Sequence, residues 1–95
     1  MHNRLPWLIE ALDRYELDGI LVSTPENRRY LSGFTGSAGY LLVSKTQAEL
    51  ATDSRYTEQA TEQAEDFQVV PTQSGWNWLV ESLQKSGLHR LGFES

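Results

Sequence analysis

The 95-residue chain is long enough for one small domain, and its 39% apolar and 22% charged residues are typical of a folded protein. Its net charge of −5 argues against a nucleic-acid partner, because phosphate backbones are bound by clustered Lys and Arg. The absence of cysteine excludes disulfides and thiolate zinc sites and agrees with a cytoplasmic location, and no apolar run approaches the roughly 20 residues that cross a membrane.

The first third of the chain alternates helical and strand patterns. Apolar residues recur at helical spacing over residues 5–12, which predicts a helix with one buried face. Residues 20–23 follow as a short buried strand. Thr24 before Pro25 is typical of a helix start, and Gly33 is expected to end that second helix.

The middle of the chain predicts a hairpin and a third helix. Residues 38–44 and 48–52 form two strand patterns joined by a tight turn, so these strands are antiparallel. Asp53 follows the second strand and is placed to cap a helix over residues 54–64. Its repeated Thr-Glu-Gln-Ala unit gives a seam of small residues and a row of carboxylates. We interpret that row as a solvated face rather than a site for a partner.

The last third predicts a strand, a helix and a further strand. The first strand covers residues 67–71, and residues 91–94 form the beginning of the last strand. The core face of the helix between them is expected to hold Trp76, Leu79, Val80 and Leu83. Trp78 points off that face, so an exposed position at an interface and partial packing against the sheet are both open.

The order of these elements predicts an α/β domain over residues 1–95. Helices are expected to pack on a mixed, mostly parallel sheet that contains one antiparallel hairpin. The last strand pattern opens a further step that the 95 residues do not complete. We therefore expect the chain to be a fragment of a longer protein, ending near the edge of its domain.

The stretch LSGFTGSAGYLLV, residues 31–43, has the glycines of a phosphate-binding loop but not its context. A Walker loop carries a lysine after its glycines, and a dinucleotide loop runs from strand into helix, whereas this one runs from helix into strand. A nucleophile elbow needs GxSxG, and Ser37 has no evident base. A structural turn and an exposed loop that presents Phe34 to a site are both open.

Metal ligands are scarce in the sequence. Two distant histidines and scattered carboxylates do not form the converging set of three or more ligands that a catalytic ion needs. Asp53 stands at a strand end, where we favour a helix cap over a metal ligand. Arg55 could hold a carboxylate bidentately or pair on the surface with Asp53 or Glu58.

The stretch NRRYLSGFTGSAGYLLV, followed after the hairpin by ATDSRYTEQA, resembles the N-terminal domain of the creatinase and prolidase family, found in Xaa-Pro aminopeptidases and dipeptidases. The matching residues are Asn27, Tyr30, Leu31, Gly33, Phe34, residues 36–39, Thr52, Asp53, Arg55, Tyr56, Glu58, Gln59 and Ala60. The two motifs with the hairpin between them are specific, and the resemblance covers nearly the whole chain. It implies a ribonuclease H-like fold.

The resemblance implies that this domain is not itself catalytic. In the family a separate pita-bread domain holds two divalent ions, manganese, cobalt or zinc, and hydrolyses the bond before proline. The expected partners are that catalytic domain of the same polypeptide, a second copy in a homodimer, and proline-containing peptides. No metal ion is expected in the 95 residues.

The resemblance also implies which segments face the substrate entrance. The candidate entrance residues are Phe34, Ser37, Asp53, Arg55 and Tyr56. A stand-alone ribonuclease H-like nuclease is the alternative, but it would need several carboxylates around two metal ions. A domain used purely for self-association is the third hypothesis.

Overall fold

The structure is a computed structural model that describes residues 5–36, 38–45, 47–73 and 75–94. Its elements in chain order are α1 (Leu5–Arg14), β1 (Gly19–Val22), α2 (Pro25–Ser32), β2 (Tyr40–Ser44), β3 (Ala48–Thr52), a 3-10 helix η1 (Ser54–Tyr56), α3 (Thr57–Gln63), β4 (Gln68–Pro71), α4 (Gly75–Ser86) and β5 (Leu91–Glu94). This order confirms the predicted α/β alternation and the β2–β3 hairpin.

The five strands form one mixed sheet in the order β4-β3-β2-β1-β5. Strand β2 runs antiparallel to both β1 and β3, whereas β4 joins β3 and β5 joins β1 in parallel. The mixed, mostly parallel sheet is confirmed, because β1, β3, β4 and β5 run in one direction and β2 in the other. Strand β2 lies between β1 and β3, so the hairpin strand makes a second antiparallel pair in addition to the one with β3.

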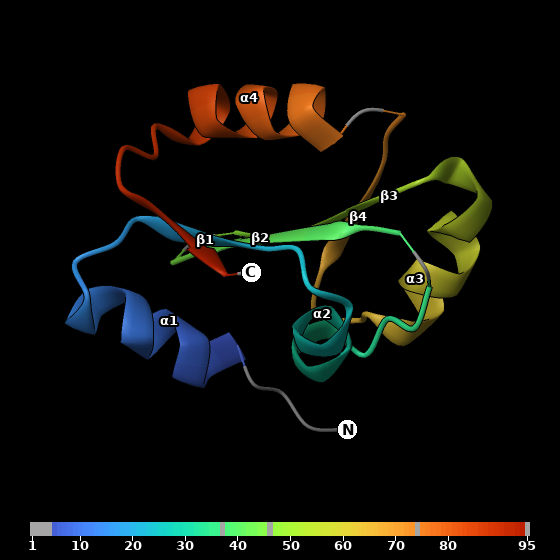
Figure 1. Ribbon diagram of the computed structural model, residues 1–95, viewed down its shortest axis with the longest axis horizontal. Coiled ribbons are helices and arrows are strands. Elements are labelled where there is room, and N and C mark those ends of the chain that lie inside the picture. The colour runs from blue at the N-terminus through green and yellow to red at the C-terminus, as the bar shows by residue number, and fades with distance from the viewer. Residues whose placement is uncertain (1–4, 37, 46, 74, 95) are drawn as a thin grey trace.

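Helices cover both faces of the sheet. Figure 1 shows α4 on one face and α1 and α2 on the other. Successive residues of β2 point to opposite faces, so Leu41 and Val43 pack in one buried cluster with Leu8 of α1, while Leu42 packs in a second cluster with Trp78 of α4. The sheet therefore separates two apolar layers, each closed by its own helices.

The first two helices follow the sequence pattern. Leu8 and Leu12 are buried on the inner face of α1, as predicted, while the side chain of Leu5 lies outside the described set. Helix α2 ends at Gly33, whose φ of 84° is left-handed. A β-carbon there would lie 2.9 Å from the carbonyl oxygen of Gln63, so both conformation and space favour glycine.

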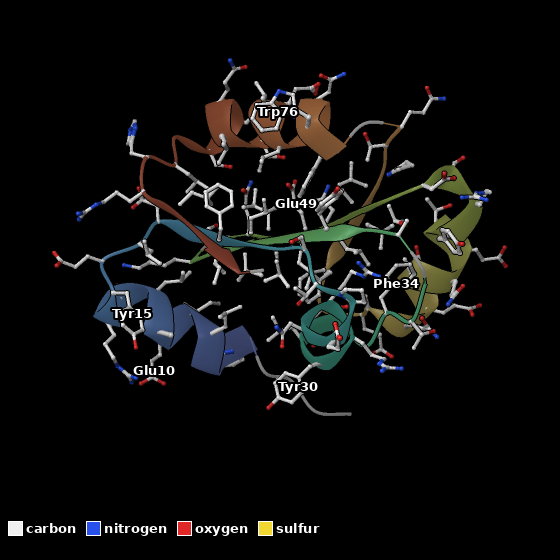
Figure 2. All side chains as sticks on the ribbon, in the orientation of Figure 1. Glu10, Tyr15, Tyr30, Phe34, Glu49 and Trp76 are labelled. Atoms are coloured by element: carbon white, nitrogen blue, oxygen red, sulfur yellow. The ribbon has the colours of Figure 1, made fainter. Side chains whose placement is uncertain are left out.

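The buried face of α4 differs from the predicted one. Trp76 is 72% exposed and Val80 is exposed, whereas Trp78 is 6% exposed and packs on the sheet together with Leu79. The hydroxyl of Ser82 donates to the carboxylate of Glu49 at 2.7 Å, which lies between α4 and the sheet (Figure 2). The apolar pattern predicted a buried Trp76, because a pattern of apolar residues assigns no buried position to a serine such as Ser82.

Asp18 connects the start of β1 to the segment before β5. Its carboxylate accepts hydrogen bonds from the backbone N–H groups of His89 at 2.8 Å and Arg90 at 2.9 Å. These two bonds, of which the one from His89 has the larger effect, hold the pKa of Asp18 below its ordinary value of 3.8. The ionised carboxylate therefore stabilises the junction of two parallel strands that are far apart in sequence.

The Asp18→Asn variant is expected to lower Tm at neutral pH, and its difference from the wild type should narrow as the pH falls below 3.8. Because the folded pKa is depressed, the contribution is present above the ordinary pKa and is lost as pH falls through the folded pKa. Thermal unfolding followed by circular dichroism across a pH series measures this. Asp66→Asn, on an exposed turn, is the control. A difference that is constant with pH would contradict the role of the charge.

Candidate functional site

The two motifs singled out in the sequence meet at one edge of the sheet. The hydroxyl of Thr52, the last residue of β3, donates to the carbonyl of Ala38 at 2.7 Å. This bond holds the glycine loop, defined here as residues 33–39, beside the carboxyl ends of the parallel strands β3 and β4. In open α/β sheets such strand ends are the usual place for ligands.

A pocket of about 230 Å³ opens at this edge and is called the edge pocket below. Its wall comes from three strands: Gly39 and Tyr40 from the start of β2, Thr52 and Asp53 from the end of β3, and Thr72 after β4. Backbone and short polar side chains therefore border it, with Asp53 as the carboxylate among the described residues that line it.

Asp53 acts as a helix cap, as the sequence predicted. Its Oδ1 accepts the backbone N–H of Arg55 at 2.9 Å, at the start of η1. This backbone hydrogen bond, helped by a side-chain bond from Arg55, holds the pKa of Asp53 below its ordinary value. The carboxylate is thus ionised at neutral pH and can still accept from a group in the edge pocket.

Arg55 lies on the surface next to Asp53. Its Nε is 3.3 Å from Asp53 Oδ1, and its side chain is 73% exposed. The guanidinium also lies over the ring of Tyr56, at 5.3 Å from the ring centre. The surface pair with Asp53 is therefore present, and the exposed guanidinium keeps donors available for a second acceptor.

Phe34 does not lie on the surface, so of the two interpretations left open for the glycine loop, the structure contradicts the exposed loop that presents this ring. Its ring is 1% exposed and meets Tyr56 edge to face, with ring centres 6.2 Å apart. A β-carbon at Gly36 would lie 2.2 Å from Phe34 Cζ, so glycine is what lets the loop fold over the ring. Of the other loop candidates, Ser37 lies outside the described residues.

Arg28 is a second residue that holds the glycine loop, and sequence reasoning missed it. The side chain is 4% exposed; Nη1 donates to the carbonyl of Gly39 at 2.9 Å and Nη2 to that of Gly36 at 2.8 Å. The guanidinium also lies 6.0 Å from the ring centre of Phe34. The available signal was the loop itself, since its buried carbonyls need donors and Arg28 lies on the helix that leads directly into it.

Asp53 is the carboxylate that the described residues place at the edge pocket, beside backbone carbonyls and hydroxyls. Within the part of the chain that the structure describes, no three His, Cys, Asp or Glu residues gather in a way that could hold a metal ion. Nor do the described residues include a helix that is both long and apolar enough to span a membrane. The edge pocket offers carbonyls, hydroxyls and one ionised carboxylate to a polar ligand.

Comparison with known proteins gives matches over nearly the whole chain. The model of the creatinase/prolidase N-terminal domain family matches residues 4–95. The uncharacterised peptidase YqhT of Bacillus subtilis is 40% identical over 81 residues, covering 82% of this chain and 22% of that protein. A probable Xaa-Pro aminopeptidase P of Talaromyces marneffei is 30% identical, covering 97% of this chain and 20% of that protein. The chain thus spans about a fifth of these relatives.

Solved structures share the fold. An Xaa-Pro dipeptidase from Bacillus anthracis superposes with a TM-score of 0.90 at 37% identity, covering 96% of this chain and 26% of that one. The N-terminal domain of the cytoplasmic peptidase PepQ from Mycobacterium tuberculosis gives a TM-score of 0.88 at 41% identity, covering 96% of this chain and 72% of that one. The sheet and helices described above are therefore those of these domains.

Proposed function

Since the chain belongs to the creatinase/prolidase N-terminal domain family, we propose that it serves as the non-catalytic N-terminal domain of a metal-dependent Xaa-Pro peptidase. In this proposal a separate catalytic domain of the same polypeptide binds two divalent ions, manganese, cobalt or zinc, and hydrolyses the peptide bond before proline. The names of the relatives and the part of their length that this chain matches support the proposal.

The proposed role of this domain is to shape the substrate entrance of the catalytic domain. The observation that carries it is the Thr52–Ala38 hydrogen bond, which joins the glycine loop to the end of β3 and forms the edge pocket there. We further propose that the parent protein is a cytoplasmic homodimer; a relative of known structure is described as a cytoplasmic peptidase.

Arg55 is proposed to face that entrance, where it would bind a substrate carboxylate or an acidic side chain of the catalytic domain. In a full-length peptidase carrying this domain, Arg55→Ala is expected to raise KM for Xaa-Pro peptides about tenfold, the value of one charge-assisted hydrogen bond. In the isolated chain the same change should alter the free energy of unfolding by less than about 1 kcal/mol, because the side chain is exposed.

The control is Arg90→Ala, another exposed arginine, on the segment before β5. It should leave KM unchanged. Equal kinetics for wild type and Arg55→Ala would contradict a role of Arg55 at the entrance.

The isolated chain, assayed with added manganese, cobalt or zinc, should not hydrolyse Xaa-Pro peptides. Turnover that follows the chain through purification would overturn the non-catalytic assignment.

A further inference from the structure

Arg28 carries a buried positive charge that the described residues do not neutralise. The ion pairs among those residues join Lys45 to Asp13 and Arg55 to Asp53, and neither involves Arg28. Its two hydrogen bonds go to uncharged carbonyls, and its buried Nε donates to no described group. An uncompensated buried charge is costly, so this guanidinium is poised to accept an anion.

A second pocket lies beside this guanidinium. It has a volume of about 460 Å³ and is called the arginine pocket here; Arg28, Arg29 and Thr35 line it together with Glu26, Phe34 and other residues. The edge pocket is bordered by the later residues of the glycine loop and the arginine pocket by the earlier ones. Arg29, Thr35 and Glu26 are exposed, so the pocket is open to a ligand from solution.

The charges around the arginine pocket favour a singly charged anion. Arg28 and Arg29 both line the pocket and their positive charges attract a negative ligand, while the carboxylate of Glu26 opposes a second negative charge. A carboxylate also matches the planar fork of a guanidinium, and the exposed Arg29 can bind it through two parallel hydrogen bonds while the buried Arg28, whose Nη atoms donate to the loop, contributes its charge. Burial lowers the pKa of Arg28, but a guanidinium stays protonated in proteins and keeps its charge for this purpose.

We propose that the arginine pocket binds a carboxylate group between the guanidinium groups of Arg28 and Arg29. The group can come from the free end of a peptide or from an acidic side chain of a neighbouring domain. This site goes beyond the proposed function and does not depend on it, because it rests on the buried charge and the pocket of this chain alone.

The test is a titration of the ¹⁵N-labelled chain with sodium acetate, against sodium chloride at equal ionic strength. The Nε–Hε signal of Arg28 and the amide signals of Thr35 and Gly36 are expected to shift saturably with acetate. The Nε–Hε signal of Arg90, an exposed arginine that does not line the pocket, is the internal control and should not saturate. The same shifts with chloride, or equal responses of Arg28 and Arg90, would overturn the site.

Two exposed residues of the pocket test the charge argument in opposite directions. Arg29→Gln should weaken acetate binding about threefold and Glu26→Gln should tighten it by about the same factor, the scale of screened surface charges. Arg90→Gln is the control and should leave the affinity unchanged. None of these changes alters the Arg28 bonds, so the fold is retained. Equal affinity in all variants would contradict the proposal.

Two single-carboxylate probes then separate the sources. N-acetylglycine presents a chain-end carboxylate, and N-acetylglutamic acid α-amide presents a side-chain carboxylate. Saturable binding of either supports the carboxylate site, and the tighter of the two identifies the source. Inorganic phosphate that binds more tightly than both would overturn the carboxylate assignment.

Discussion

Replacing Arg28 with methionine is expected to lower the free energy of unfolding by about 3 kcal/mol. The variant leaves the carbonyls of Gly36 and Gly39 without the donors they have in the folded chain. Methionine retains most of the apolar stem of the side chain, so the loss reports the two hydrogen bonds, reduced by the cost of burying the charge that the variant no longer carries. Urea unfolding followed by circular dichroism measures the change, and the glycine loop amides should also exchange faster with deuterium.

The matched control is the neighbouring residue on the same helix. Arg29 is exposed, so Arg29→Met should change the free energy of unfolding by less than about 0.5 kcal/mol. Arg28→Lys keeps the charge but cannot reach both carbonyls with a planar fork. Its free energy of unfolding should fall by at least half as much as that of Arg28→Met. An Arg28→Met chain as stable as the wild type would show that the glycine loop keeps its conformation without the hydrogen bonds from Arg28.

Substituting Gly36 by alanine is expected to destabilise the chain by about 2–3 kcal/mol, the upper range of overpacking in a core. The new β-carbon would lie 2.2 Å from Phe34 Cζ, and that ring is enclosed by the core and cannot swing into solvent. Either the loop must lift, breaking the Arg28 bonds, or the ring must leave its place against Tyr56. Chemical denaturation of the single variant measures the cost.

A double-mutant cycle with Phe34→Leu tests the cause. A leucine removes the ring edge, so Gly36→Ala should cost at most half as much in the Phe34→Leu background, a coupling of about 1–2 kcal/mol. Gly87→Ala is the control, because no heavy atom lies within 4 Å of its added β-carbon and its cost comes from a φ of 66°. It should add independently to Phe34→Leu. Coupling as large at Gly87 would contradict the steric explanation.

Features of the fold set by neighbouring residues were predicted correctly. The helical spacing in α1, the β2–β3 strand pair, the left-handed end at Gly33 and the cap at Asp53 each depend on contacts between residues close in sequence. Backbone sterics and local hydrogen bonds decide such features before any tertiary contact forms. The two family motifs were also visible in the sequence, because their residues include the glycine that ends α2 and the aspartate that caps η1.

The tertiary structure alone decided which side chains are buried and what the loop does. Trp76 and Trp78 both suit a helix face. The face of α4 that packs on the sheet holds Trp78, and there Ser82 donates to Glu49, whereas Trp76 is exposed. Phe34 and Arg28 are both buried, because the glycine loop folds back on α2 and its carbonyls need an internal donor. Burial depends on partners 8 to 33 residues away in the sequence. The spacing of apolar residues does not depend on such distant partners, so it could not decide which of these side chains are buried.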